Sequence, residues 1–113
     1  MRIPNSDRAV IPAEKLRDYL LSQKHPIGRF KATFFAGLGY TADDWVILEA
    51  DLRSQHLPLN AEESDRSAYG RKFVITGRLT GPAGTSAILI SVWVIHNGED
   101  SPRFVTAYPG ASR

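Results

Sequence analysis

Residues 86–96, SAILISVWVIH, decide the fold of this chain. They form an almost unbroken apolar run with turn residues on either side, GPAG at 81–84 and NGEDSP at 97–102. An apolar run of this length between turns predicts a central strand that is covered on both faces, at least in part.

A second strand is predicted before this run, and a third follows it. In residues 71–79, Phe73, Ile75 and Leu79 alternate with Lys72, Val74, Thr76 and Arg78, as in a strand with one buried face. Gly77 interrupts this pattern and predicts a bulge. The third strand, RFVTAY at 103–108, is stopped by Pro109 and Gly110. Short turns join the three strands, which predicts an antiparallel meander.

Simple alternation divides the last strand into two faces. Phe104, Thr106 and Tyr108 share one face, and Arg103, Val105 and Ala107 share the other. If the first set faces the helices, Thr106 lies among apolar side chains and needs a hydrogen-bond partner. A phosphate, a lysine or nearby backbone could supply that partner. Tyr108 is a candidate for the core, for a base-stacking platform or for a cap on the sheet.

Three helices are predicted upstream of the sheet. The first follows Pro12, with Leu16, Tyr19 and Leu20 at helical spacing up to about residue 22. The second spans about 28–38, after the break that Pro26 imposes. The third opens at Thr41, because a threonine with an acid three residues later is typical of a capping box. Glu49 and Arg53, four apart, predict a salt bridge on that helix.

The order of these elements predicts an α+β fold in a single domain, residues 1–113. Its helical half covers about 12–55, an acidic polar loop about 56–70, and its sheet half about 71–109.

The composition is that of an ordinary globular protein, with 42% hydrophobic and 23% charged residues among 113. The net charge of +2 permits an anionic partner without requiring one. No cysteine is present, which excludes disulfides, a thiolate nucleophile and thiolate metal sites. The sequence shows neither a signal peptide nor an apolar run of membrane-spanning length, so we expect a cytoplasmic protein without a membrane partner. It gives no oligomeric state.

Lys31 is the residue that most needs an explanation. On a helical wheel it falls inside an apolar arc, with Arg29 and Ala36 opposite. The apolar positions of that arc are Ile27, Phe30, Phe34, Phe35 and Leu38. Lys31 and Arg29, in the first turn of a helix, could bind a phosphate. Alternatively, Lys31 runs its methylene groups along the arc and lifts its amine into solvent.

The histidines give one candidate for proton transfer. His25 precedes the same helix start, and histidine as a class exchanges protons near neutral pH. A loop histidine without function would have the same pattern. His56, at a helix end, and His96, at a strand end, are weaker candidates. No spacing indicates a metal site, and no motif indicates a cofactor.

Two blocks of sequence carry a family resemblance. They are KLRDYLLSQKHPIGRFKATFFAGLGYTADDW (15–45) and WVIHNGEDSPRFVTAYPG (93–110). Together they resemble a widespread bacterial domain family of unknown function, whose members occur alone and at the C-termini of polymorphic toxins. The order of helices then sheet, with a terminal VTAYP strand, is similar to toxin nucleases of the barnase, EndoU, colicin and RelE superfamily.

This resemblance implies metal-independent cleavage of an RNA substrate by 2′-hydroxyl attack on phosphate. It implies roles for six residues: His25 as acid or base, Lys31 with Arg29 or Arg103 on the phosphate, Thr106 as its hydrogen-bond donor, and Tyr108 stacked on a base. Lys31 would then point across the helix–sheet cleft at Thr106. A cognate antitoxin or immunity protein would be the partner. Two alternatives stay open: an interaction module in which Lys31 pairs with a buried carboxylate, and a small-molecule pocket between helices and sheet.

Overall fold

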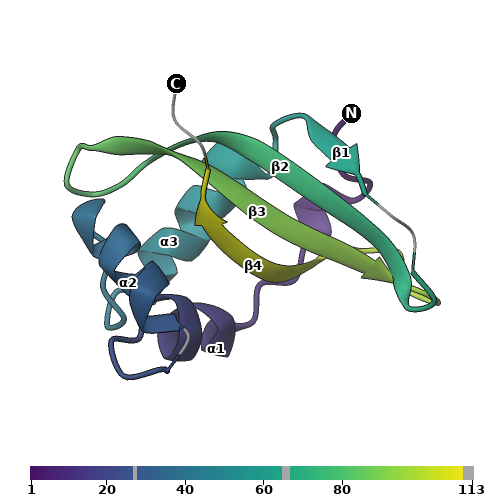
Figure 1. Cartoon of the computed structure of the whole chain (residues 1–113). Helices are drawn as coiled ribbons and strands as arrows, with labels where there is room; N and C mark the ends of the chain where they lie inside the picture. Colours follow the sequence, from purple (N-terminus) through teal and green to yellow (C-terminus); the bar gives the residue numbers. More distant parts are fainter. Residues whose placement is uncertain (27, 65–66, 111–113) are drawn as a thin grey trace.

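The chain folds as helices followed by a sheet, which confirms the predicted α+β class (Figure 1). This computed structural model describes residues 1–26, 28–64 and 67–110. The helical elements are η1 (Ser6–Arg8), α1 (Ala13–Lys15), η2 (Leu16–Leu20), α2 (Gly28–Gly37), α3 (Trp45–Asp51) and η3 (Leu52–His56). The strands are β1 (Ala61–Glu63), β2 (Gly70–Thr80), β3 (Ser86–His96) and β4 (Arg103–Pro109).

The four strands form one antiparallel sheet in the order β1-β2-β3-β4, so each strand pairs with its neighbour in sequence. The predicted meander of β2, β3 and β4 is confirmed. The loop predicted at 56–70 is wrong in part, because Ala61–Glu63 pairs with β2 as a short edge strand. Acidic side chains at such an edge do not produce the alternation that marks a strand in sequence, since only Ala61 of the three is buried.

The predicted helices are present, with one change at the start of the third. α1 continues directly into η2, and α3 continues directly into η3. Both η2 and η3 are π-helical segments, which are wider than an α-helix. α3 begins at Trp45 with Asp44 before it, and no side chain caps it. The capping box predicted at Thr41 is therefore wrong, because the chain makes a turn at 41–44 before the helix starts. The predicted pair on this helix is confirmed, with Arg53 Nη2 at 2.9 Å from Glu49 Oε2.

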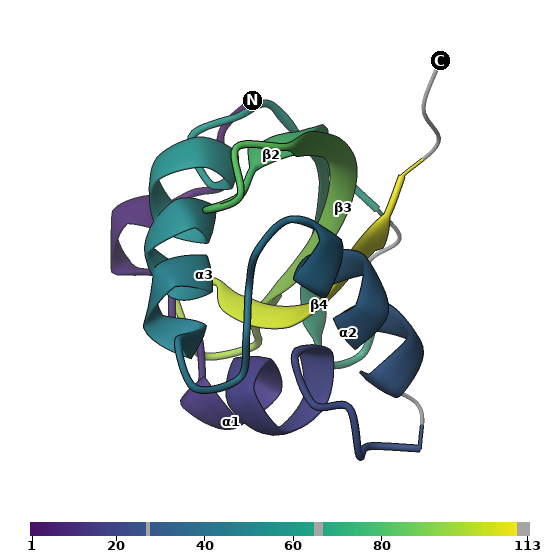
Figure 2. The ribbon, with the colours of Figure 1, turned by 90° about the vertical axis from the view of Figure 1, so that its left-hand side faces the viewer.

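The core lies between the concave side of the bent sheet and the helices, as the side view in Figure 2 shows. β2 contributes the three apolar residues predicted for its buried face, Phe73, Ile75 and Leu79. The helices and the remaining strands contribute mainly Leu16, Leu20, Phe35, Leu38, Leu48, Leu52, Leu89, Trp93 and Phe104.

The wheel of α2 is correct for most positions but wrong for Phe30. Ala32, Phe35 and Leu38 form its buried face, and Arg29 and Ala36 are exposed as predicted. Phe30 is 70% exposed, because the buried face is narrower than the apolar arc of the sequence. Ile27 lies outside the described residues.

Gly77 does not mark a bulge. It pairs with Leu89 in an unbroken β2–β3 register, so the predicted bulge is wrong at this position. A Cβ atom here would lie 2.3 Å from Leu59 Cδ1, and close packing explains the glycine. Among the described residues, no helix has the length and apolar character needed to cross a membrane.

Candidate functional site

The amine of Lys31 joins the helical half to the sheet. Lys31 Nζ lies 3.1 Å from the Tyr19 hydroxyl and 3.0 Å from Thr106 Oγ1, and donates to both. The side chain thus crosses from α2 to β4, in the direction that the sequence analysis expected for a phosphate-binding lysine. Its amine does not simply extend into solvent, and among the described residues no carboxylate pairs with it.

A bulge in β4 sets the position of Thr106. Thr106 pairs with Val92 and Phe104 pairs with Trp93, so Val105 is an extra residue between them. The strict alternation predicted for this strand is therefore wrong. Phe104 is buried in the core, whereas Thr106, on the far side of the bulge, is half-buried at the sheet edge. Because of this shift, Thr106 is within reach of α2.

Two tyrosines flank the Lys31 amine. The amine lies 5.2 Å from the ring centroid of Tyr19 and 5.9 Å from that of Tyr108, within the range of cation–π contacts. The hydrogen bond from Lys31 lowers the pKa of the Tyr19 phenol below its ordinary value, although partial burial acts in the opposite direction. The spacing of Tyr19 places it on a helix face, and no motif in the sequence distinguishes it as a site residue.

The groove at this point is mainly basic. Its lining consists of Glu14, Lys15, Tyr19, Lys31, Val105 and Thr106. Lys15 Nζ donates to the Val105 carbonyl oxygen at 3.2 Å, at the bulge. Both lysines bond neutral oxygens, whereas arginines supply the cations of the ion pairs between described residues. The charge of the two lysines is therefore available to an anion in the groove, opposed there by Glu14.

His25 contacts this site through the ring of Tyr19. The two rings meet edge to face with their centroids 4.9 Å apart, on a turn where the His25 amide donates to Ser22 Oγ. Arg29 lies on the next turn of chain. Its guanidinium stacks on the exposed Phe30 ring at 4.9 Å, and its amide already bonds the His25 carbonyl.

Arg103 lies apart from the Lys31 amine. Its guanidinium pairs with Glu99 at 3.2 Å, in the turn between β3 and β4. Thr106 lies three positions after Arg103, which corresponds to roughly 10 Å of strand. His96 is exposed at the end of β3, on the same side of the molecule as this turn.

His56 has a structural environment. It is fully buried, with Nδ1 at 2.7 Å from Ser91 Oγ and Nε2 within 3.2 Å of the Gly77 and Leu89 carbonyl oxygens. Burial lowers its pKa, so the neutral form is favoured. A neutral imidazole with a partner on each nitrogen, closed off from solvent, has no role in proton exchange with a substrate.

No candidate metal centre accompanies these groups. Within the described part of the chain, no three histidine, cysteine, aspartate or glutamate side chains are grouped to hold an ion. Among the described residues, the hollow that Lys31 lines and the one that shares Thr106 with it are open grooves.

Comparisons with known proteins place the chain in a family. It belongs to DUF6883, a domain of unknown function whose model matches residues 2–111. The fold is similar to one chain of a contact-dependent growth inhibition toxin–immunity protein complex from Klebsiella pneumoniae 342, with a TM-score of 0.68. That similarity has 20% sequence identity and covers 89% of this chain and 99% of the other, and it shows a shared fold. No curated protein matches the sequence.

Proposed function

We propose that this chain is a toxin-like ribonuclease, which cleaves RNA without a metal ion and is controlled by a cognate antitoxin or immunity protein. The observation that carries this proposal is the Lys31 amine, held at 3.1 and 3.0 Å by two neutral hydroxyl groups in an open groove. A phosphate oxygen could bind there without breaking an ion pair. The shared fold with a chain from a toxin–immunity protein complex supports the biological setting.

The chemistry would be an attack by the ribose 2′-hydroxyl on the adjacent phosphorus. A base takes the 2′ proton, the 2′ oxygen bonds to phosphorus, and the bond to the 5′ oxygen breaks as an acid protonates it. The products are a 2′,3′-cyclic phosphate and a 5′-hydroxyl. Negative charge grows on the non-bridging oxygens during this step, so a fixed cation beside them lowers the barrier.

Lys31 and Thr106 would bind the phosphate together. Thr106 Oγ1 accepts a hydrogen bond from Lys31, so its own proton can be donated to a phosphate oxygen. Arg29 is exposed on the first turn of α2 and does not line this groove, so its charge would act on the phosphate from a greater distance. Arg103 is left out of this phosphate site because its guanidinium already bonds Glu99.

Two groups could transfer the protons. The Tyr19 hydroxyl bonds Lys31 directly, and its lowered pKa makes the phenolate more accessible as a base. His25, against the Tyr19 ring, is the second candidate. Tyr108 offers its ring to a base next to the scissile phosphate, because its ring centroid lies 5.9 Å from the Lys31 amine.

The test compares Lys31→Met with the native chain, with Lys24→Met as the control. Lys24 is exposed and does not line the groove, so its replacement removes the same charge without removing a group that contacts Thr106 or Tyr19. We expect the native chain and Lys24→Met to cleave RNA in the presence of EDTA and leave 2′,3′-cyclic phosphate ends. Lys31→Met should lose about 10²- to 10³-fold in kcat, as for loss of one donor to a developing oxyanion.

Expression in bacteria gives a second measurement. Growth arrest by the native chain, relieved by Lys31→Met at equal soluble expression, supports the proposal. A folded Lys31→Met variant that cleaves RNA as well as the native chain would remove Lys31 from the site. Absence of cleavage by the native chain across total cellular RNA would favour the interaction module.

A further inference from the structure

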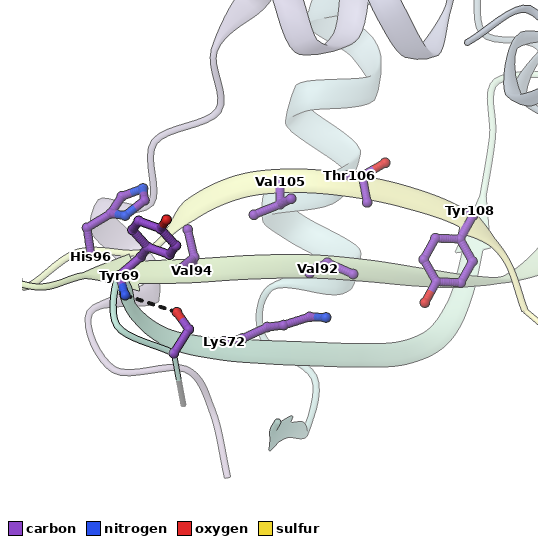
Figure 3. Close-up of a pocket in the computed structure, with 9 residues that line it drawn as sticks. Tyr69, Lys72, Val92, Val94, His96, Val105, Thr106 and Tyr108 are labelled. Atoms are coloured by element: carbon purple, nitrogen blue, oxygen red, sulfur yellow. Dashed lines mark hydrogen bonds between the residues drawn. The ribbon is translucent and has the colours of Figure 1, made fainter. Parts of the chain in front are cut away.

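A second groove lies on the outer face of the sheet, away from α3 (Figure 3). It shares Thr106 with the groove that Lys31 lines. Its volume is about 460 Å³. Val92, Val94 and Val105 form its floor, and Tyr69 and Tyr108 lie at its two ends. Thr106 lines both this groove and the Lys31 groove, so the two form one continuous surface.

We infer that this outer-face groove binds a single strand of RNA that leads from the scissile phosphate at Lys31 to Tyr69. The inference rests on the proposed ribonuclease function and adds its substrate class, an RNA with several unpaired nucleotides beside the cleavage site. The groove would hold those nucleotides by stacking and by charge, without reading a duplex.

The aromatic side chains of the groove are placed for stacking. Tyr69 is 77% exposed and Tyr108 is 37% exposed, so both rings present surface to a ligand. β3 carries the groove between them: Tyr108 pairs with Ile90, and the Tyr69 carbonyl accepts from the Asn97 amide. Seven residues of strand correspond to roughly 23 Å. This length fits several nucleotides, with a base stacked at each end.

The charge of the groove favours an anion. Lys72 extends along the floor between the two tyrosines (Figure 3), and Lys31 donates to Thr106, which lines the groove. In the described part of the chain, neither lysine pairs with a carboxylate. The described acidic residue nearest to Lys72 in sequence is Glu63, and its carboxylate is bonded to Arg71. No described acidic residue lines the groove.

A single strand of RNA can contact both the tyrosine rings and the lysine charges of this groove, whereas a duplex can contact only the charges. In an A-form duplex the bases are stacked inside the helix, so it would present phosphates, hydroxyls and base edges to this groove but no exposed base face for the tyrosines. An acidic peptide would satisfy Lys72 but would offer the tyrosine rings no flat partner. Unpaired nucleotides present bases and phosphates in alternation, as the tyrosines and lysines require.

The test measures binding separately from cleavage. The probe is a fluorescent, fully 2′-O-methylated oligoribonucleotide of roughly eight nucleotides, which can bind but lacks the attacking hydroxyl. Fluorescence anisotropy gives Kd for the native chain, Tyr69→Ala, Tyr69→Phe, Lys72→Met and the control Lys24→Met. All of these positions are exposed, so the variants should keep the native fold, which thermal unfolding checks.

We expect Tyr69→Ala to weaken binding by about 5- to 150-fold, the range for loss of one base–aromatic stack, and Tyr69→Phe to restore it. Lys72→Met should weaken binding and reduce the slope of log Kd against log salt by roughly 0.7. Lys24→Met should bind as the native chain does. A native chain that does not bind the probe, or variants that bind it equally well, would overturn the inference, as would equal competition by a polyglutamate peptide.

Cleavage of two unmethylated substrates separates this inference from the proposed function. For the octanucleotide, kcat/KM in Tyr69→Ala should fall further than for a dinucleotide, which reaches only the Lys31 end of the groove. An equal loss of kcat/KM on both substrates would refute RNA binding by the outer-face groove but leave the proposed ribonuclease function intact. Binding of the methylated probe without cleavage of either substrate would refute the proposed ribonuclease function but support RNA binding by the outer-face groove.

Discussion

Replacing Ser91 by alanine should destabilise the protein strongly, although the change removes one oxygen atom. Ser91 Oγ lies 2.8 Å from Trp93 Nε1 and 2.7 Å from His56 Nδ1, in a region closed to solvent. The tryptophan nitrogen can only donate, so the serine oxygen accepts from it and gives its own proton to His56 Nδ1. His56 Nε2 then carries the remaining proton, toward the Leu89 carbonyl at 3.1 Å.

The magnitude follows from the two groups that Ser91→Ala leaves without a partner. Each buried donor or acceptor that loses its hydrogen bond costs about 1–3 kcal/mol, so Trp93 Nε1 and His56 Nδ1 together cost about 2–6 kcal/mol. A domain of this size has a total stability of about 5–15 kcal/mol. One serine therefore controls a large fraction of the free energy of unfolding.

Urea denaturation, followed by tryptophan fluorescence and by circular dichroism, measures this free energy. Ser86→Ala is the matched control, because Ser86 lies on the same strand and its hydroxyl bonds Thr80 Oγ1 at 2.6 Å, but it is exposed to water. The control should change stability by at most about 0.5 kcal/mol. If both variants lose the same small amount, the Trp93–Ser91–His56 chain does not hold the core, and His56 regains its place among the candidates for proton exchange.

Three further predictions concern stability. Burial lowers the pKa of His56, so as the pH falls the unfolded chain takes up a proton before the folded chain does. The free energy of unfolding should therefore stay level above about pH 6.5 and fall below it. A profile that stays level down to about pH 5.5 would contradict this prediction. Burial and Asp51 raise the pKa of Tyr40, so its phenol stays protonated and donates to Asp51 Oδ2 at 2.6 Å. Tyr40→Phe should therefore lower the free energy of unfolding, measured in urea, by about 1–3 kcal/mol. An unchanged free energy would show that another group replaces this hydrogen bond. Gly77→Ala should lower the melting temperature through the contact with the end of the Leu59 side chain, at a cost of about 1 kcal/mol, because that side chain must rotate away. In the same chain, Leu59→Ala should cost less than the two single changes added together.

Local patterns predicted the elements of the fold because each depends on neighbours in the chain. Alternation in 71–79 and helical spacing in 28–38 are consequences of backbone geometry, and both elements are present. β1 escaped prediction because three residues cannot show a period, and a strand at an edge is defined by its partner. The cap predicted at Thr41 failed because a turn and a helix start have the same local chemistry.

The sequence by itself determined which side chains were available for a site: a lysine among apolar residues, a threonine in the last strand, and no cysteine. Only the tertiary structure decided how they meet. The bulge at Val105 turns Thr106 out of the core, and a one-residue insertion is visible only against the partner strand. Tyr19, 12 residues from Lys31, and Thr106, 75 residues from it, meet the same amine because the helices pack across the edge of β4. Contacts between residues so far apart in sequence depend on the packing of whole elements, and no local pattern records them.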